Sequence, residues 1–174
     1  VPALDFGLIR KEAGLPPEGD IVSILESMPL RDREKGWKVI ERHEKEASRN
    51  IRLQRGAREV LLELRQKDVK IGLLTRNSSK SVQIFMESTG IVFDHAITRE
   101  YPFMKPRPEP VLHMIEKWDV APDKTLVVGD YIHDIECGKA AGAKTCFFAN
   151  PGMTSYAEFA DYSVSSFEEL MKII

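Results

Sequence analysis

Short apolar runs alternate with segments of helical length from Gly56 to the end of the chain. We expect strands at Val69–Thr75, His95–Thr98, Thr125–Asp130, Thr145–Ala149 and Tyr162–Val164. We expect helices at Ala57–Gln66, Lys80–Ser88, Glu109–Trp118, a segment that ends at Ala141, and Phe167–Ile174. This alternation predicts βαβ units and a parallel sheet, and therefore an α/β fold. The strands are apolar almost throughout, which is typical of a sheet covered on both faces.

The first fifty residues have a different pattern, with helix signals only. Amphipathic stretches at Asp5–Ala13 and Asp20–Met28 are separated by a Gly-Leu-Pro-Pro turn. A longer charged helix with few apolar positions is expected at Arg31–Asn50. Such a helix buries little by itself, so we predict a small helical domain at residues 1–54 and the α/β core at residues 55–174.

Composition excludes several classes of protein. The 174 residues are 43% apolar and 30% charged, which excludes disorder. Lys and Arg total 25 against 27 Asp and Glu, so binding of nucleic acid through its phosphates is disfavoured. No apolar run is long enough to span a bilayer, and we expect no membrane association. With only two cysteines, a cytoplasmic location is expected, with organelle targeting and oligomeric state left open.

Polar residues follow the first predicted strand, at the kind of position where open α/β sheets bind ligands. Directly after the apolar run come Thr75, Arg76, Asn77 and Ser78. Ser and Asn are common helix caps, so capping of the next helix explains them well. The alternative is a phosphate site, formed by the Thr75 hydroxyl and the following backbone amides. The residues alone leave both interpretations open.

An acidic pair follows a later strand. Asp130 ends the most apolar strand, and Asp134 lies in the first turn of the next helix. One carboxylate would be enough to complement the helix dipole, whereas two at the mouth of a sheet suit Mg²⁺. We favour Asp130 as the direct ligand, with Asp134 bound directly or through water. His133 and Cys137 are also four residues apart, but the lack of a second ligand pair disfavours zinc.

Lys105 lies in a proline-rich loop, Phe-Met-Lys-Pro-Arg-Pro-Glu-Pro. A Lys in an extended loop is ordinarily solvated. The alternative is a fixed positive charge that neutralises a phosphoryl oxygen or an acidic nucleophile. Pro106 and Pro108 would restrict the positions that the ammonium group can reach.

Taken together, these segments resemble the haloacid dehalogenase superfamily of phosphohydrolases. The second, third and fourth motifs of the family match Leu73–Asn77, Lys105–Pro108 and Gly129–Asp134. The chain looks most like the phosphoglycolate phosphatase-like subgroup. The resemblance implies a Rossmann-like parallel sheet at residues 55–174, with residues 1–54 as a small helical cap inserted after the first strand.

The resemblance also implies a Mg²⁺-dependent phosphatase that acts on a small phosphorylated metabolite through an aspartyl-phosphate intermediate. Thr75 and the amides of Arg76 and Asn77 would bind the phosphoryl oxygens. Lys105 would neutralise charge on the nucleophile and the phosphoryl group. Asp130, with Asp134 nearby, would hold Mg²⁺ against the developing negative charge.

The family's first motif, Asp-x-Asp-Gly-Thr, is absent. Asp5 is no substitute, because no apolar strand precedes it and the second Asp is missing. We expect the first strand upstream of Val1, since that strand is central in the family's sheet and its loss would expose unpaired backbone groups. The alternatives are a phosphomutase or a dehalogenase on the same scaffold, or a non-catalytic binding protein. A dehalogenase needs no metal, so the acidic pair favours phosphoryl transfer.

Overall fold

The computed structural model describes residues 4–48, 51–152 and 155–174, which form two compact units. The helical unit consists of Val1–Leu53 and Asn77–Gly90, and the sheet unit consists of Gln54–Arg76 and Ile91–Ile174. The chain therefore enters the sheet unit one residue before the predicted domain start at residue 55. No helix formed by the described residues has the length and apolar character that crossing a membrane requires.

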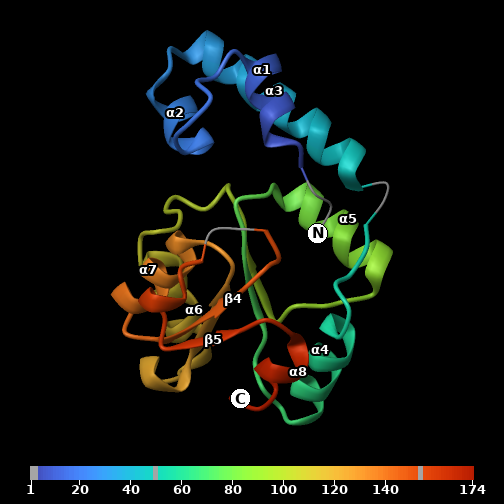
Figure 1. The fold of residues 1–174 in the computed structure, drawn as a ribbon, viewed down its shortest axis with the longest axis vertical. Helices are drawn as coiled ribbons and strands as arrows, with labels where there is room; N and C mark the ends of the chain where they lie inside the picture. Colours follow the sequence, from blue (N-terminus) through green and yellow to red (C-terminus); the bar gives the residue numbers. More distant parts are fainter. Residues whose placement is uncertain (1–3, 49–50, 153–154) are drawn as a thin grey trace. The chain divides into compact units, whose positions relative to one another are not determined.

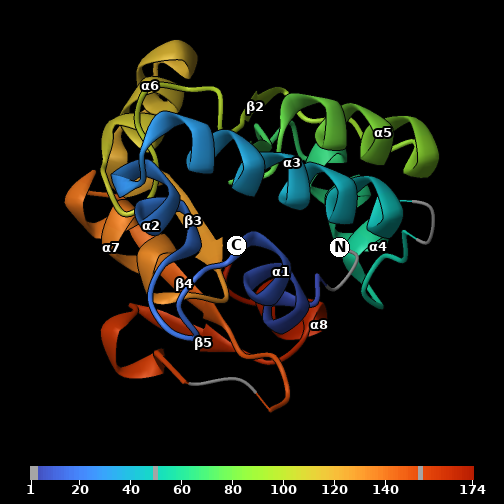
Figure 2. The same ribbon diagram turned by 90° about the horizontal axis from the view of Figure 1, so that it is seen from above.

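The first helices of the helical unit pack around one apolar cluster. Both α1 (Phe6–Ala13) and α2 (Ile21–Ser27) lie against α3 (Leu30–Ala47), as Figure 2 shows. Asp5 and Asp20 cap α1 and α2, because each carboxylate accepts a hydrogen bond from the backbone amide three residues later. The fully or nearly buried members of the cluster are Ile9, Leu15, Leu25 and Ile40.

Gly36 explains how the highly charged α3 packs closely against α2. A Cβ atom at this position would lie 2.3 Å from Cδ2 of Leu25, and Leu25 is fully buried. The missing side chain is thus what allows the close approach. The predicted helix at Arg31–Asn50 is confirmed over most of its length, and its last two residues lie outside the described residues.

The sheet unit has parallel strands, as predicted, but they form two sheets (Figure 1). In one sheet, β1 (Gly72–Leu74) pairs with β2 (His95–Ile97). In the other, β3 (Leu126–Gly129) pairs with β4 (Lys144–Phe148), and β4 pairs with β5 (Tyr162–Val164). Within the described ranges, no backbone pairing joins β1 to β3.

The helices of the sheet unit follow the predicted order. The bounds of α4 (Ala57–Gln66) and α6 (Glu109–Trp118) are as predicted, and α7 (Ile132–Ala140) follows β3. The last helix, α8 (Phe167–Leu170), is shorter than the predicted Phe167–Ile174. It ends early because the amides of Lys172 and Ile173 bond to carbonyls only three residues back, which tightens the chain into 3₁₀-type turns.

One apolar cluster supports both sheets. Its buried members come chiefly from α6 and α7 and are Val111, Ile115, Cys137, Ala141 and Ala143. Leu74 of β1 and Val127 of β3 both pack against it. The two sheets therefore share a layer of helices, although β1 and β3 do not pair with each other. The α/β class and the parallel arrangement predicted from the sequence are confirmed.

Candidate active site

The loop after β1 carries the predicted phosphate-binding residues. The backbone amide of Thr75 donates to the Ile97 carbonyl at 3.0 Å, which extends the pairing with β2 by one residue. The N-cap of α5 (Ser79–Thr89) is Ser78, whose hydroxyl accepts from the amide of Ser81 at 3.2 Å. Ser78 therefore supplies the side-chain cap of α5, as the capping interpretation expects of this loop. Asn77 belongs to the helical unit, whereas Thr75 and Arg76 belong to the sheet unit.

Lys105 and Asp134 form an ion pair, Nζ to Oδ1, in which the side chains are only 15% and 11% exposed. The other oxygen of Asp134 accepts from the Tyr131 amide at 3.3 Å. Gly129 makes room for this carboxylate, because a Cβ atom there would lie 2.2 Å from Cγ of Asp134. Lys105 is therefore held in place rather than solvated, and its peptide bond to Pro106 is cis.

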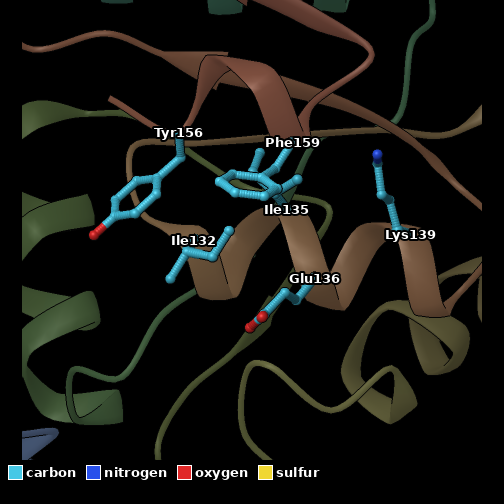
Figure 3. Close-up of a pocket in the computed structure, with 6 residues that line it drawn as sticks. All are labelled: Ile132, Ile135, Glu136, Lys139, Tyr156 and Phe159. Carbon is cyan, nitrogen blue, oxygen red and sulfur yellow. The ribbon is translucent and has the colours of Figure 1, made fainter. Parts of the chain in front are cut away.

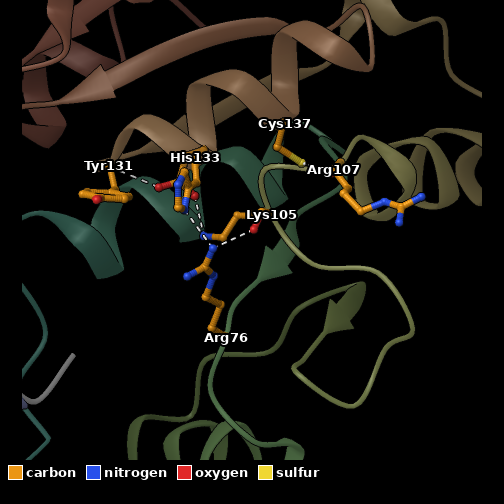
Figure 4. A network of polar contacts seen from close by, with 7 residues as sticks. Arg76, Lys105, Arg107, Tyr131, His133 and Cys137 are labelled. Carbon is orange, nitrogen blue, oxygen red and sulfur yellow. Dashed lines mark hydrogen bonds and ion pairs between the residues drawn. The ribbon is translucent and has the colours of Figure 1, made fainter. Parts of the chain in front are cut away.

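Arg76 joins this pair to the start of α7, as Figure 4 shows. One terminal nitrogen, Nη2, lies 2.7 Å from the Lys105 carbonyl oxygen and 2.8 Å from Nδ1 of His133. A guanidinium group only donates, so this contact requires His133 to accept at Nδ1. The His133 ring also makes an edge contact with Tyr131, with ring centroids 4.9 Å apart.

Asp130 leaves β3 directly before α7 and is half-buried. Its Oδ2 accepts from Nδ2 of Asn150 at 2.8 Å, and among the described residues no further contact to its carboxylate is seen. Mg²⁺ is usually held by one or two carboxylates together with water and substrate phosphate, so a single available carboxylate oxygen fits it. Both oxygens of Asp134 are bound to protein donors, whereas Asp130 has one such contact, to Asn150.

The described residues contain no cluster of three or more His, Cys, Asp or Glu side chains that would make a complete protein-only metal site. Cys137 is also excluded as a nucleophile or metal ligand. Burial raises the pKa of its thiol to about 11, and its Sγ donates to the Arg107 carbonyl at 2.9 Å. A protonated, hydrogen-bonded thiol is neither nucleophilic nor a good ligand.

A hollow of about 390 Å³ on the outer side of α7 lies apart from the predicted residues (Figure 3). It is lined by Ile132, Ile135, Glu136, Lys139, Tyr156 and Phe159. Its lining is mostly apolar and includes none of the residues discussed above. The contacts among Arg76, Lys105 and Asp134 involve none of these side chains.

The structure brings three predicted residues, Arg76, Lys105 and Asp134, into one contact network. Asp130 lies at the same strand end but is bound to Asn150. Sequence reasoning missed Asn150, which follows β4, and His133 was considered only as a metal ligand. The position of His133 within the fourth motif was a usable signal, whereas Asn150 carried none.

Three comparisons bear on this geometry. Residues 15–148 match the model of the family described as haloacid dehalogenase-like hydrolase. A haloacid dehalogenase-like hydrolase domain-containing protein of Arabidopsis thaliana is 31% identical over 192 residues, covering all of this chain and 78% of the relative. A putative pyrophosphatase of Clostridium perfringens is 42% identical over 90 residues, half of this chain and 42% of its own length.

Among solved structures, a predicted phosphoglycolate phosphatase of Haemophilus somnus has a similar fold, with a TM-score of 0.75. The sequences are 20% identical, and the match covers 96% of this chain and 87% of the other. At this identity the likeness concerns the fold, and it extends through nearly the whole of both chains.

Proposed function

Because the chain belongs to the haloacid dehalogenase-like hydrolase family, we propose that it acts as a Mg²⁺-dependent phosphatase. The substrate in this proposal is a small phosphate monoester of the phosphoglycolate type. The observation that carries the proposal is the Lys105–Asp134 pair in contact with Arg76, with Asp130 at the same strand end. The Lys105 ammonium group for phosphoryl charge and the Asp130 carboxylate for Mg²⁺ suit phosphoryl transfer.

Each residue has a distinct role in the proposal. The Thr75 hydroxyl and the amides of Arg76 and Asn77 bind the phosphoryl oxygens. Lys105 neutralises negative charge on the transferring group, and Asp134 keeps its ammonium group in position. Asp130 is the direct ligand of the metal, with Asp134 nearby. When bound, Mg²⁺ supplies positive charge that stabilises the phosphoryl oxygens.

The nucleophile in this proposal is the first aspartate of the family's Asp-x-Asp-Gly-Thr motif, which the 174 residues do not contain. It would lie on a strand that pairs with both β1 and β3. The two strands support this position, since both pack on one apolar cluster without pairing to each other in the described residues. The carboxylate attacks phosphorus and the ester oxygen leaves with a proton from the second aspartate. Water then hydrolyses the aspartyl-phosphate.

Residues 1–54 act in this proposal as the cap that selects the leaving group. The protein works in the cytoplasm, where its two thiols stay reduced; both Cys137 and Cys146 are buried and unpaired by disulfide.

The test is hydrolysis of p-nitrophenyl phosphate by the full-length protein, with and without a chelator. We expect Mg²⁺-dependent release of phosphate, and a loss of about 100-fold or more in kcat for Asp130→Asn. Asp123→Asn is the matched control, because Asp123 is an exposed carboxylate in the 3₁₀ turn before β3. A hydrolysis rate that is unchanged by the chelator and by Asp130→Asn would refute the metal assignment.

Three further assays of the same protein separate the alternatives. Transfer of phosphate to a second position of a sugar phosphate, without release, would identify a phosphomutase. Binding of phosphate without any turnover would identify a non-catalytic binding protein. Chelator-resistant release of halide from a haloacid would identify a dehalogenase.

A further inference from the structure

Three side chains form a hydrogen-bonded chain that ends on Asp130. Nδ2 of Asn150 lies 2.8 Å from Oδ2 of Asp130. On its other side, Oδ1 of Asn150 lies 3.2 Å from Nε2 of Gln54. The three residues are far apart in sequence, and all belong to the sheet unit. Among the described residues, these are the two hydrogen bonds of the Asn150 side chain, one at its nitrogen and one at its oxygen.

The direction of this chain follows from the chemistry of its members. An ionised carboxylate only accepts hydrogen bonds, so Asn150 must turn its amino group toward Asp130. Its carbonyl oxygen then faces Gln54, which must present its own amino group. The opposite orientation of Asn150 would place two oxygens against each other. Asp130 thus dictates both amide orientations, and Gln54 stabilises the correct one for Asn150.

The hydrogen bonds of Asn150 affect how Asp130 is oriented as a metal ligand. The hydrogen bond from Asn150 to Oδ2 restricts rotation of the Asp130 carboxylate and leaves Oδ1 as the oxygen that Asn150 does not bind. Groups that bind the ligands of a metal ion commonly set the ligand's orientation and the ion's affinity. We propose that Asn150 is a positioning residue that presents Oδ1 of Asp130 to Mg²⁺, and that Gln54 holds the Asn150 amide in the orientation this requires. The inference rests on the proposed function, because it takes Asp130 as the Mg²⁺ ligand.

Gln54 gives the sharpest test. The hydrogen-bonded series Gln54–Asn150–Asp130, called the relay below, and simple electrostatics predict opposite changes in Mg²⁺ affinity for Gln54→Glu. Gln54→Glu adds a negative charge near the site, and charge alone would strengthen Mg²⁺ binding. In the relay, the new carboxylate can only accept a hydrogen bond, as Asp130 does. The two carboxylates therefore compete for the amino group of Asn150. We therefore expect Gln54→Glu to weaken Mg²⁺ binding. Gln66→Glu, an equal change at the exposed end of α4, is the control and should have little effect.

The measurement is the affinity of the full-length protein for Mg²⁺ alone, by isothermal titration calorimetry, with no substrate present. We expect Asn150→Ala to weaken binding about 10- to 100-fold. Gln54→Ala should weaken it less, in the same direction. Circular dichroism checks that each variant is folded, and the exposed position of Gln54 keeps the test available if Asn150→Ala does not fold.

The outcomes separate this inference from the proposed function. If Asp130→Asn abolishes Mg²⁺ binding while Gln54→Glu strengthens it or leaves it unchanged, the relay is wrong and the metal site stands. If Asp130→Asn leaves Mg²⁺ binding unchanged, the metal site itself is wrong. Weaker binding in Asn150→Ala and Gln54→Glu, with Gln66→Glu unaffected, supports the relay.

Discussion

The two units of the chain bury their apolar side chains in different ways. In the helical unit, Leu25 and Ile9 are 0% and 1% exposed, although α3 is among the most charged segments of the sequence. In the sheet unit, β3 is the most apolar strand, yet Val128 is 39% exposed. Apolar content is therefore a poor guide to burial here.

The difference arises from which parts of the sequence supply the groups that bury the apolar side chains. A helix satisfies its own backbone, so α1, α2 and α3 need only a few well-placed side chains and one glycine to close a core. A strand needs neighbours on both edges, which distant parts of a sequence must supply. In the described residues β3 is paired on the β4 side, and its other edge faces no strand. Burial in the sheet unit thus depends on long-range pairing, and burial in the helical unit does not.

The largest effect is expected at the Lys105–Asp134 pair, which ties the proline-rich loop to α7. Lys105→Met leaves a nearly buried carboxylate without its partner, which costs about 3–5 kcal/mol in similar pairs. Phosphatase activity should also be lost. Urea unfolding measures the first effect. The double variant Lys105→Met with Asp134→Asn should recover much of the stability but none of the activity; equal stability of both variants would mean that the pair holds nothing in place.

Gly36→Ala tests the close contact in the helical unit. The added Cβ would meet Leu25, and overpacking of this kind costs about 1–3 kcal/mol. The higher helix propensity of Ala opposes this by up to about 1 kcal/mol. In a Leu25→Ala background the clash is gone, so the same change should become stabilising. Urea unfolding of the four proteins checks this reversal, and a cost of equal size in both backgrounds would contradict the packing argument.

Most of the fold followed from the sequence because helix periodicity and caps are local signals. The bounds of α4 and α6 were predicted to the residue. Strand lengths were less accurate. Val69–Thr75 was expected to be a strand, but the strand itself is confined to Gly72–Leu74. One backbone hydrogen bond continues the pairing beyond each end, from the Asp94 amide to the Ile71 carbonyl and from the Thr75 amide to the Ile97 carbonyl. At Ile71 the Asp94 side chain accepts from the backbone amide at 2.9 Å, in place of a backbone carbonyl of the neighbouring strand.

The candidate site was predictable only in part, because some of its contacts depend on long-range packing rather than on local signals. Thr75, Lys105 and Asp130 were identifiable because each follows a strand or lies in a stiffened loop. That Lys105 pairs with Asp134 depends on how α7 packs beside the loop. The role of Asn150 depends on the pairing of β3 with β4, which brings the ends of the two strands together. No short stretch of sequence contains that information.

Val128 gives a direct probe of the exposed edge, and a small effect is expected. Val128→Thr introduces a hydroxyl at a position that is 39% exposed, so the loss of stability in the 174-residue chain should stay below about 0.5 kcal/mol. The same change in a longer protein with a strand beside β3 would bury the hydroxyl, at a cost of about 1–3 kcal/mol. Urea unfolding of both proteins makes the comparison. Equal costs would argue against a strand at this edge.

The two thiols have no effect at neutral pH and act only in alkali, where they report whether the core beneath the sheets excludes solvent. Burial raises the pKa of Cys137 and of Cys146 from 9.0 to about 11. Both thiols are protonated at pH 7 in the folded and unfolded states, so their titration does not make stability depend on pH there. Above pH 9 the unfolded chain loses these protons first, and stability should fall as the pH rises toward 11.

Alkylation rates give the more sensitive measurement of the same property. Thiolates react and thiols do not, so at pH 8.5 both cysteines should be alkylated by iodoacetamide far more slowly in the folded protein than in urea. Asp123→Asn, a surface change, is a control that should leave both rates unaltered. Rapid labelling of Cys137 in the folded protein would mean that the cluster beneath β1 and β3 is open to solvent. Exposure would then extend from the edge of β3 into the core of the sheet unit, rather than being limited to that edge.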